Sequence, residues 1–151
     1  MNTPNTPSIV GSENRKGFRL YKKEKLCSAI AISQLFGRER PKGPATNNGD
    51  THSALAYPLR CVWRNNPRRS SDAPIQFLIS IPKKRLRHAV DRVLMRRRVR
   101  EAFRLNHLQY PLPQGCRFDV AFIYVGNGLE QYEFVERAIH RLLKKIQKSA
   151  Q

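Results

Sequence analysis

Acidic side chains are scarce in this chain of 151 residues: 11 Asp and Glu stand against 29 Lys and Arg, which gives a formal net charge of +18. Such an imbalance makes copies of the protein repel one another and attracts polyanions from a distance. The few acids are also scattered, whereas a protein nuclease that uses metal ions needs clustered carboxylates. Nucleic acid is therefore the first candidate partner, and an anionic membrane surface is the second.

Long apolar runs are absent as well. The longest apolar stretch, 120–125, has only the length of a strand, so we expect no segment that spans a bilayer and no membrane partner. The polar, Pro/Asn/Thr-rich residues 1–14 do not resemble a signal peptide. These absences predict a cytoplasmic protein.

Motifs for metal binding and catalysis are lacking too. Cys27, Cys61 and Cys116 form no CxxC pair and no Cys/His ligand spacing, so we expect buried or half-buried free thiols. The four histidines share no common spacing, and no Gly-rich phosphate loop appears. We therefore predict neither catalytic residues nor a metal site in the protein itself.

Hydrophobic periodicity predicts one domain over 16–148, preceded by a disordered tail at 1–15. A long mobile loop rich in Pro, Gly, Asn and Thr is expected at 38–53. Helices are predicted at 23–36, 89–106 and 130–147, and strands at 59–64, 75–81 and 118–125. The last strand is apolar on both faces and should lie inside the sheet. The order α-β-β-α-β-α predicts an α+β sandwich.

The helix at 89–106 is the most informative segment. At 3.6 residues per turn, Arg92, Arg96, Arg100 and Arg104 form one stripe with Arg97 at its border, an arc of roughly 140°. The opposite side, expected to face the sheet, carries Val90, Leu94, Met95, Val99 and Ala102, and the stem of Arg98 should lie along the surface.

A solvated helix face would normally mix charges of both signs, because like charges four residues apart repel. Over 83–104 the only acids are Asp91 and Glu101. Arginine forks can bind phosphate oxygens in pairs, and the stripe offers almost no Asn or Gln to read bases. The segment therefore favours contact with the backbone of structured RNA.

At this segment the sequence resembles the protein component of bacterial ribonuclease P. That family has two basic residues after a strand, then Ala-Val, an Arg-Asn-Arg core, a Lys/Arg run and Arg-Glu-x-aromatic-Arg. This chain has, in the same order, Lys83-Lys84, Ala89-Val90, Arg92, Arg96-Arg97 and Arg100-Glu101-Ala102-Phe103-Arg104. Val93 and Leu94 replace the Asn and second Arg of the core, so only Arg92 is carried over from it. The resemblance extends more loosely over 18–147.

The resemblance implies a left-handed β-α-β crossover between parallel strands, against the usual right-handed rule. It implies an accessory protein subunit of an endoribonuclease that removes the 5′ leader of precursor tRNA. The chemistry would belong to the catalytic RNA, with magnesium held mainly by that RNA. RNA-binding residues would be Lys83, Lys84, Arg92, Arg96, Arg97, Arg100 and Arg104.

The resemblance also implies a cleft between the first helix and the sheet that takes the single-stranded leader. Aromatic stacking beside positive charge usually holds single strands. The candidates here are Leu26, Phe36, Arg60, Trp63 and Arg64. Plain core packing remains the alternative for Phe36 and Trp63.

Three other functions stay open. A ribosome-associated or other structural RNA-binding protein could use the same arginine helix, and only the copurifying RNA would separate the two. A DNA-binding helix-turn-helix module lacks its two short adjacent helices and tight turn here, so no DNA partner is expected. A protein-only nuclease would have to cleave precursor tRNA without RNA.

Overall fold

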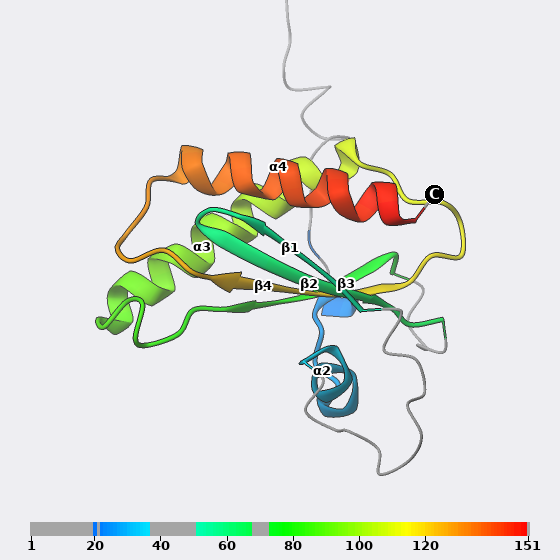
Figure 1. Cartoon of the computed structure of the whole chain (residues 1–151), viewed down its shortest axis with the longest axis horizontal. Coiled ribbons are helices and arrows are strands. Elements are labelled where there is room, and N and C mark those ends of the chain that lie inside the picture. The colour runs from blue at the N-terminus through cyan, green and yellow to red at the C-terminus, as the bar shows by residue number, and fades with distance from the viewer. Residues whose placement is uncertain (1–19, 21, 37–50, 68–72, 151) are drawn as a thin grey trace, which may run out of the picture.

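The computed structural model describes residues 20, 22–36, 51–67 and 73–150. These residues form a four-stranded sheet with helices on both faces (Figure 1), which confirms the predicted α+β sandwich. The strands stand in the order β1-β2-β4-β3 across the sheet. Their bounds are β1 Thr51–Ala56, β2 Leu59–Asn65, β3 Ile75–Ser80 and β4 Phe118–Tyr124.

Strand β4 lies inside the sheet, as its two apolar faces predicted. It pairs antiparallel with β2 on one side and parallel with β3 on the other. The chain therefore crosses from β3 to β4 through helix α3 (Ala89–Asn106), the parallel arrangement that the family resemblance implies. The left hand of this crossover stays a prediction.

The helices divide between the two faces of the sheet (Figure 1). Helices α3 and α4 (Tyr132–Ser149) cover one face, and the shorter α2 (Ala29–Phe36) covers the other. The larger of two apolar cores lies on the α3/α4 side. Within it, the ring centres of Phe77 and Phe103 are 4.3 Å apart. A smaller apolar cluster lies under α2 and contains Leu26, Ala31, Leu35, Val62 and Ala121.

The predicted order missed one strand. Residues 51–53, expected in the loop, begin β1, so the order is α-β-β-β-α-β-α. This edge strand reads Thr-His-Ser-Ala-Leu-Ala, with little of the apolar alternation that marks a strand, and is stabilised by antiparallel pairing with β2. The predicted tail at 1–15 and the loop residues 38–50 lie outside the described part of the chain.

The first helix begins later than predicted. Residues Lys22–Glu24 form a 3-10 helix, and the Leu26 amide then donates to the Phe77 carbonyl oxygen at 3.0 Å, so this segment adds to the edge of β3. Helix α2 starts at Ala29, with Ser28 Oγ accepting from the Ala31 amide at 3.4 Å in an N-cap arrangement. Ile30 points outward on this helix and is 66% exposed.

Candidate nucleic-acid interface

Helix α3 has the predicted bounds, and its sheet-facing side is largely as expected. Met95, Val99, Ala102 and Phe103 are buried, whereas Leu94 is half-buried. The prediction for Val90 is wrong, because that side chain is 77% exposed. Nine residues separate Val90 from Val99, which is about 180° around a helix, so burying one exposes the other.

Three arginines of the predicted stripe are exposed to solvent. Arg96, Arg97 and Arg100 are exposed on the side of α3 away from the sheet core. Among the described residues, no carboxylate lies within salt-bridge distance of any of these three guanidinium groups. Each keeps its donors available to an external anion such as a phosphate.

Arg92, at the start of the stripe, has a local role. Its side chain is half-buried, and Nη1 donates to the backbone oxygens of Leu86 at 2.8 Å and Arg87 at 2.7 Å. These bonds fasten the loop before α3 to the first turns of the helix. Arg92 therefore helps to shape the basic end of α3 and has fewer donors left for RNA than the three exposed arginines.

Arg104, predicted to bind RNA, is paired with a carboxylate of its own chain. Its Nε donates to Glu101 Oε2 at 3.0 Å, and its Nη2 lies 2.5 Å from Glu101 Oε1. The hydrogen bond from Arg104 lowers the pKa of Glu101, and the same bond raises the pKa of Arg104. The Glu101 side chain is 46% exposed and the Arg104 side chain is 34% exposed, so solvent screens the attraction between them. The pair therefore contributes at most about 1 kcal/mol to the stability of the fold.

Replacing Glu101 with Gln is expected to strengthen RNA binding, because it frees Arg104 for one more phosphate contact. The slope of log affinity against log salt should steepen by about one. Filter binding over a salt series measures this slope. The matched control is Glu130→Gln, which removes the same charge from a carboxylate that accepts from the Tyr57 hydroxyl and has no arginine side chain as its partner among the described residues. Equal effects of the two variants would mean that only net charge matters.

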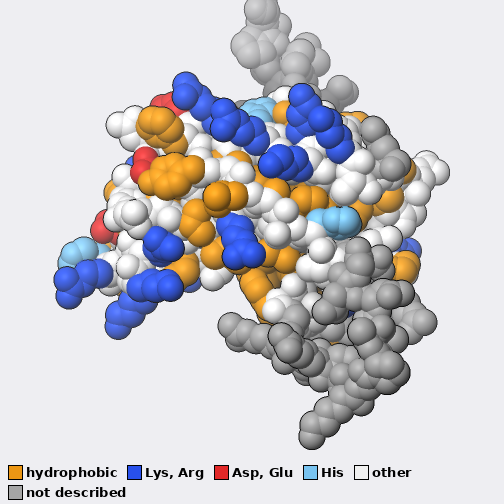
Figure 2. Space-filling model, viewed as in Figure 1, with side chains coloured by type: hydrophobic (Ala, Val, Ile, Leu, Met, Phe, Trp, Pro, Cys, Tyr) orange, Lys and Arg blue, Asp and Glu red, His pale blue; other side chains and the backbone are white. Residues whose placement is uncertain are grey.

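The loop that leads into α3 adds further positive charge. Lys83, Lys84, Arg87 and His88 line one open hollow, and all four side chains are exposed. Figure 2 shows basic side chains gathered at the lower left, where this loop lies in Figure 1. The structure thus brings the predicted residues Lys83 and Lys84 to the same end of the molecule as the beginning of α3.

Arg98 lies outside the arginine stripe, on the side of α3 that carries the apolar residues, as predicted. The side chain is half-buried, and its Nη1 donates to the backbone oxygen of Glu130. This bond ties α3 to the segment that opens α4. Arg98 is therefore a structural arginine.

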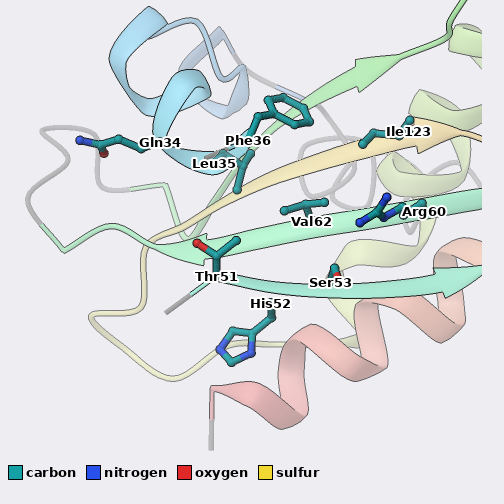
Figure 3. Close-up of a pocket in the computed structure, with 9 residues that line it drawn as sticks. All are labelled: Gln34, Leu35, Phe36, Thr51, His52, Ser53, Arg60, Val62 and Ile123. Carbon is teal, nitrogen blue, oxygen red and sulfur yellow. The ribbon is translucent and has the colours of Figure 1, made fainter. Parts of the chain in front are cut away.

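A separate hollow of about 470 Å³ opens between α2 and the sheet (Figure 3). Phe36 at the end of α2 forms one wall, Val62 and Ile123 form an apolar floor, and Arg60 supplies positive charge. The other lining residues are Gln34, Leu35, Thr51, His52 and Ser53, of which His52 points away toward α4. The hollow thus combines an aromatic ring, aliphatic surface, hydroxyl groups and a cation.

The structure brings only two of the five predicted cleft residues, Phe36 and Arg60, into this hollow. Leu26 is 6% exposed and packs beneath α2, and Arg64 lies on the same sheet face as Arg60 without lining the hollow. Trp63 lies in the core and not in the cleft, which is the alternative left open for it. It is 4% exposed on the α3/α4 side, where its Nε1 donates to Ser149 Oγ at 2.9 Å.

Strand geometry explains this placement. Successive side chains of a strand point to opposite faces, so Arg60 and Trp63, three residues apart, cannot share one face of β2. The same rule would have found Val62, which lies two residues from Arg60. Thr51 and Ser53 were missed because β1 itself was not predicted, and Ile123 carried no signal beyond its apolar strand.

Three further findings concern the described residues. No three His, Cys, Asp or Glu side chains come together there in a group that could hold a metal ion. None of the helices in the described ranges is both long and apolar enough to cross a membrane. Of the three free thiols, Cys61 is buried and Cys116 half-buried as expected, but Cys27 is exposed.

Comparison with known proteins identifies the family. Residues 49–147 match the family model described as Ribonuclease P. The ribonuclease P protein components of two strains of Porphyromonas gingivalis are each 34% identical to this chain over 132 residues, which cover 85% of this chain and 87% of theirs. The Staphylococcus aureus RNase P protein shares the fold, with a TM-score of 0.60 at 17% identity over 85% of this chain and 98% of its own. This chain belongs to the family of ribonuclease P protein components.

Proposed function

We propose that this chain binds the catalytic RNA of ribonuclease P and assists it in removing the 5′ leader of precursor tRNA. The observation that carries the proposal is the set of exposed arginines on α3, Arg96, Arg97 and Arg100, which have no carboxylate partner among the described residues. Family membership supports an RNA partner. The net charge of +18 attracts that partner over distance.

The proposal assigns the chemistry to the RNA and gives the protein no catalytic residue. Magnesium would then be held mainly by RNA phosphates, whose oxygens are the kind of ligand that this hard cation prefers. The protein contributes by neutralising phosphates and positioning the substrate.

The hollow between α2 and the sheet is the proposed site for the leader. Single-stranded nucleic acid binds where bases can stack on aromatic rings beside cationic groups. Phe36 and Arg60 supply these two elements across the hollow from each other (Figure 3), with the hydroxyl groups of Thr51 and Ser53 nearby as hydrogen-bond partners.

Reconstitution tests the proposed function. The protein should bind ribonuclease P RNA and accelerate cleavage of precursor tRNA by that RNA at moderate magnesium concentration, while the protein alone should cleave nothing. Sequencing the RNA that copurifies with the tagged protein should return the same RNA. Recovery of ribosomal RNA instead, with no acceleration of cleavage, would favour a structural role on another particle. Cleavage by the protein without RNA would place the chemistry in the protein.

Replacing Phe36 with Ala is expected to weaken binding of leader-bearing precursor tRNA to the reconstituted complex by roughly 10-fold, because a stacked base contributes about 1–3 kcal/mol. Binding of mature tRNA, which has no leader, should change little. The measurement is a pair of dissociation constants for the two RNAs.

The matched control is Ile30→Ala on the same helix, where the side chain is 66% exposed and does not line the hollow. This variant should discriminate the two RNAs as the unmodified protein does. Equal losses for both RNAs in Phe36→Ala would mean that Phe36 serves packing under α2 rather than the leader.

A further inference from the structure

Helix α4 carries a second basic surface that the proposed function does not use. Its basic residues are all exposed, and no carboxylate among the described residues forms a salt bridge with any of them. Figure 2 shows basic side chains along the upper part of the molecule, over α4. The surface comprises Arg137, Arg141, Lys144, Lys145 and Lys148.

One flank of α4 is occupied by contacts with α3 and the segment that follows it. Glu136 Oε1 accepts from Asn106 Nδ2 at 3.1 Å, and His140 Nδ1 lies 2.8 Å from the hydroxyl oxygen of Tyr110. The side facing the sheet is apolar and buried. By helical geometry, Arg137, Arg141, Lys145 and Lys148 occupy the remaining flank, which faces away from α3.

The arginine stripe of α3 points the other way. Arg98 faces α4, since it donates to the Glu130 carbonyl oxygen. Arg96 and Arg100 each lie two residues from Arg98 and hence about 160° away around the helix. The two basic surfaces therefore lie on opposite sides of the layer that α3 and α4 form, and each can meet a different segment of RNA.

The helix dipole does not account for the charges on α4. Cations near a helix C-terminus are stabilising only within about the last turn, which covers Lys148 and its neighbours. Arg137 and Arg141 stand in the second and third turns, and with Lys145 they repeat every four residues, a spacing at which like charges repel. Such a row is stabilised when an external polyanion neutralises it.

We propose that the basic flank of α4 is a second RNA-binding surface, which takes the backbone of a duplex segment separate from the one bound by α3. This inference rests on the proposed function, because it assumes the same folded RNA as partner. From Arg137 to Lys148 the flank is about 16 Å long, enough for several phosphates. Phe134, 45% exposed with Arg137 Cζ 5.8 Å from its ring centre, adds a flat apolar surface at one end.

The experiment compares three double variants of the full chain bound to ribonuclease P RNA. Arg141→Gln with Lys145→Gln neutralises the α4 flank, and Arg96→Gln with Arg100→Gln neutralises the α3 stripe. Lys22→Gln with Lys25→Gln is the control, since both of these lysines are exposed and lie on neither surface. All three remove two charges from exposed sites, and thermal melts check that each folds.

The α4 variant should make the log-log salt dependence shallower by about two, and the control by clearly less. Hydroxyl-radical footprinting should show that the α4 variant loses protection at nucleotides different from those lost by the α3 variant. An α4 variant that binds like the control, or that loses the same nucleotides as the α3 variant, overturns the second surface.

Two outcomes separate this inference from the proposed function. Losses confined to the α3 variant leave the proposed function standing and remove the α4 surface. If the unmodified protein fails to bind ribonuclease P RNA, the proposed function falls and the inference with it. An α4 variant that keeps full RNA binding but no longer binds phosphatidylserine vesicles would assign the flank to a membrane and overturn it.

Discussion

Replacing Arg96 and Arg100 together with Gln is expected to weaken binding of ribonuclease P RNA by at least about 100-fold, since each hydrogen bond to a charged group contributes about 1.5–3 kcal/mol. Both side chains are exposed and have no carboxylate partner among the described residues. Each phosphate contact also releases counterions, so the slope of log affinity against log salt should become shallower by about two.

Charge-preserving substitutions separate the contribution of paired hydrogen bonds to phosphate from the contribution of positive charge alone. Arg96→Lys with Arg100→Lys keeps both charges and should keep the slope, but it should lose part of the affinity because an ammonium group cannot bind phosphate oxygens as a fork. An unchanged slope in the Gln variant would place the RNA elsewhere on the protein. Fluorescence anisotropy with labelled RNA over several salt concentrations measures both quantities.

The structure also changes the salt dependence of RNA binding that is expected from α3. A stripe of five free arginines would give a slope of roughly −4 to −5, but Arg92 is engaged with backbone oxygens and Arg104 with Glu101. The three remaining arginines account for about −3. Glu101 stands three residues before Arg104, a spacing at which helical side chains meet, so the sequence itself indicates that these two residues pair.

The arginine helix was the easiest element to predict. Its bounds, Ala89–Asn106, follow from a long 3.6-residue periodicity between a proline-containing turn and a Pro/Gly-rich break, and both signals are local. Strand β4 was equally clear, because its continuous apolar run had to lie between two neighbours. In both elements, nearby residues determine the structure.

Strand β1 and the start of α2 depend on distant residues. Strand β1 is polar on much of its length and exists as a strand because Thr51–Ala56 pairs with β2. The segment before α2 is held by a backbone bond from Leu26 to Phe77, more than fifty residues away. No local pattern encodes such pairing. Hydrophobic periodicity alone therefore extended the predicted first helix back to residue 23, although Lys25 forms a β-bridge with Phe77.

The opposite directions of the two basic surfaces depend on the packing of α3 against α4. The sequence shows basic residues on both helices, but it does not show which flank of each faces the other. The bonds from Asn106 to Glu136 and from Arg98 to the Glu130 backbone fix those flanks. They leave one row of cations on each outer side, which suits a protein that bridges two parts of a folded RNA.

Replacing Trp63 with Ala is expected to destabilise the fold by about 3–5 kcal/mol, because the change removes a large buried ring from a packed core. The side chain is 4% exposed, stacks on His52 at 5.5 Å between ring centres, and donates to Ser149 Oγ. Urea unfolding measures the loss.

Since Trp63 faces away from the leader hollow, the fraction that still folds should bind leader-bearing and mature tRNA with the same relative affinity as the unmodified protein. Trp63→Phe, which keeps most of the ring volume, should lose less stability. A Trp63→Ala protein that stays stable but selectively loses the leader would return this residue to the cleft.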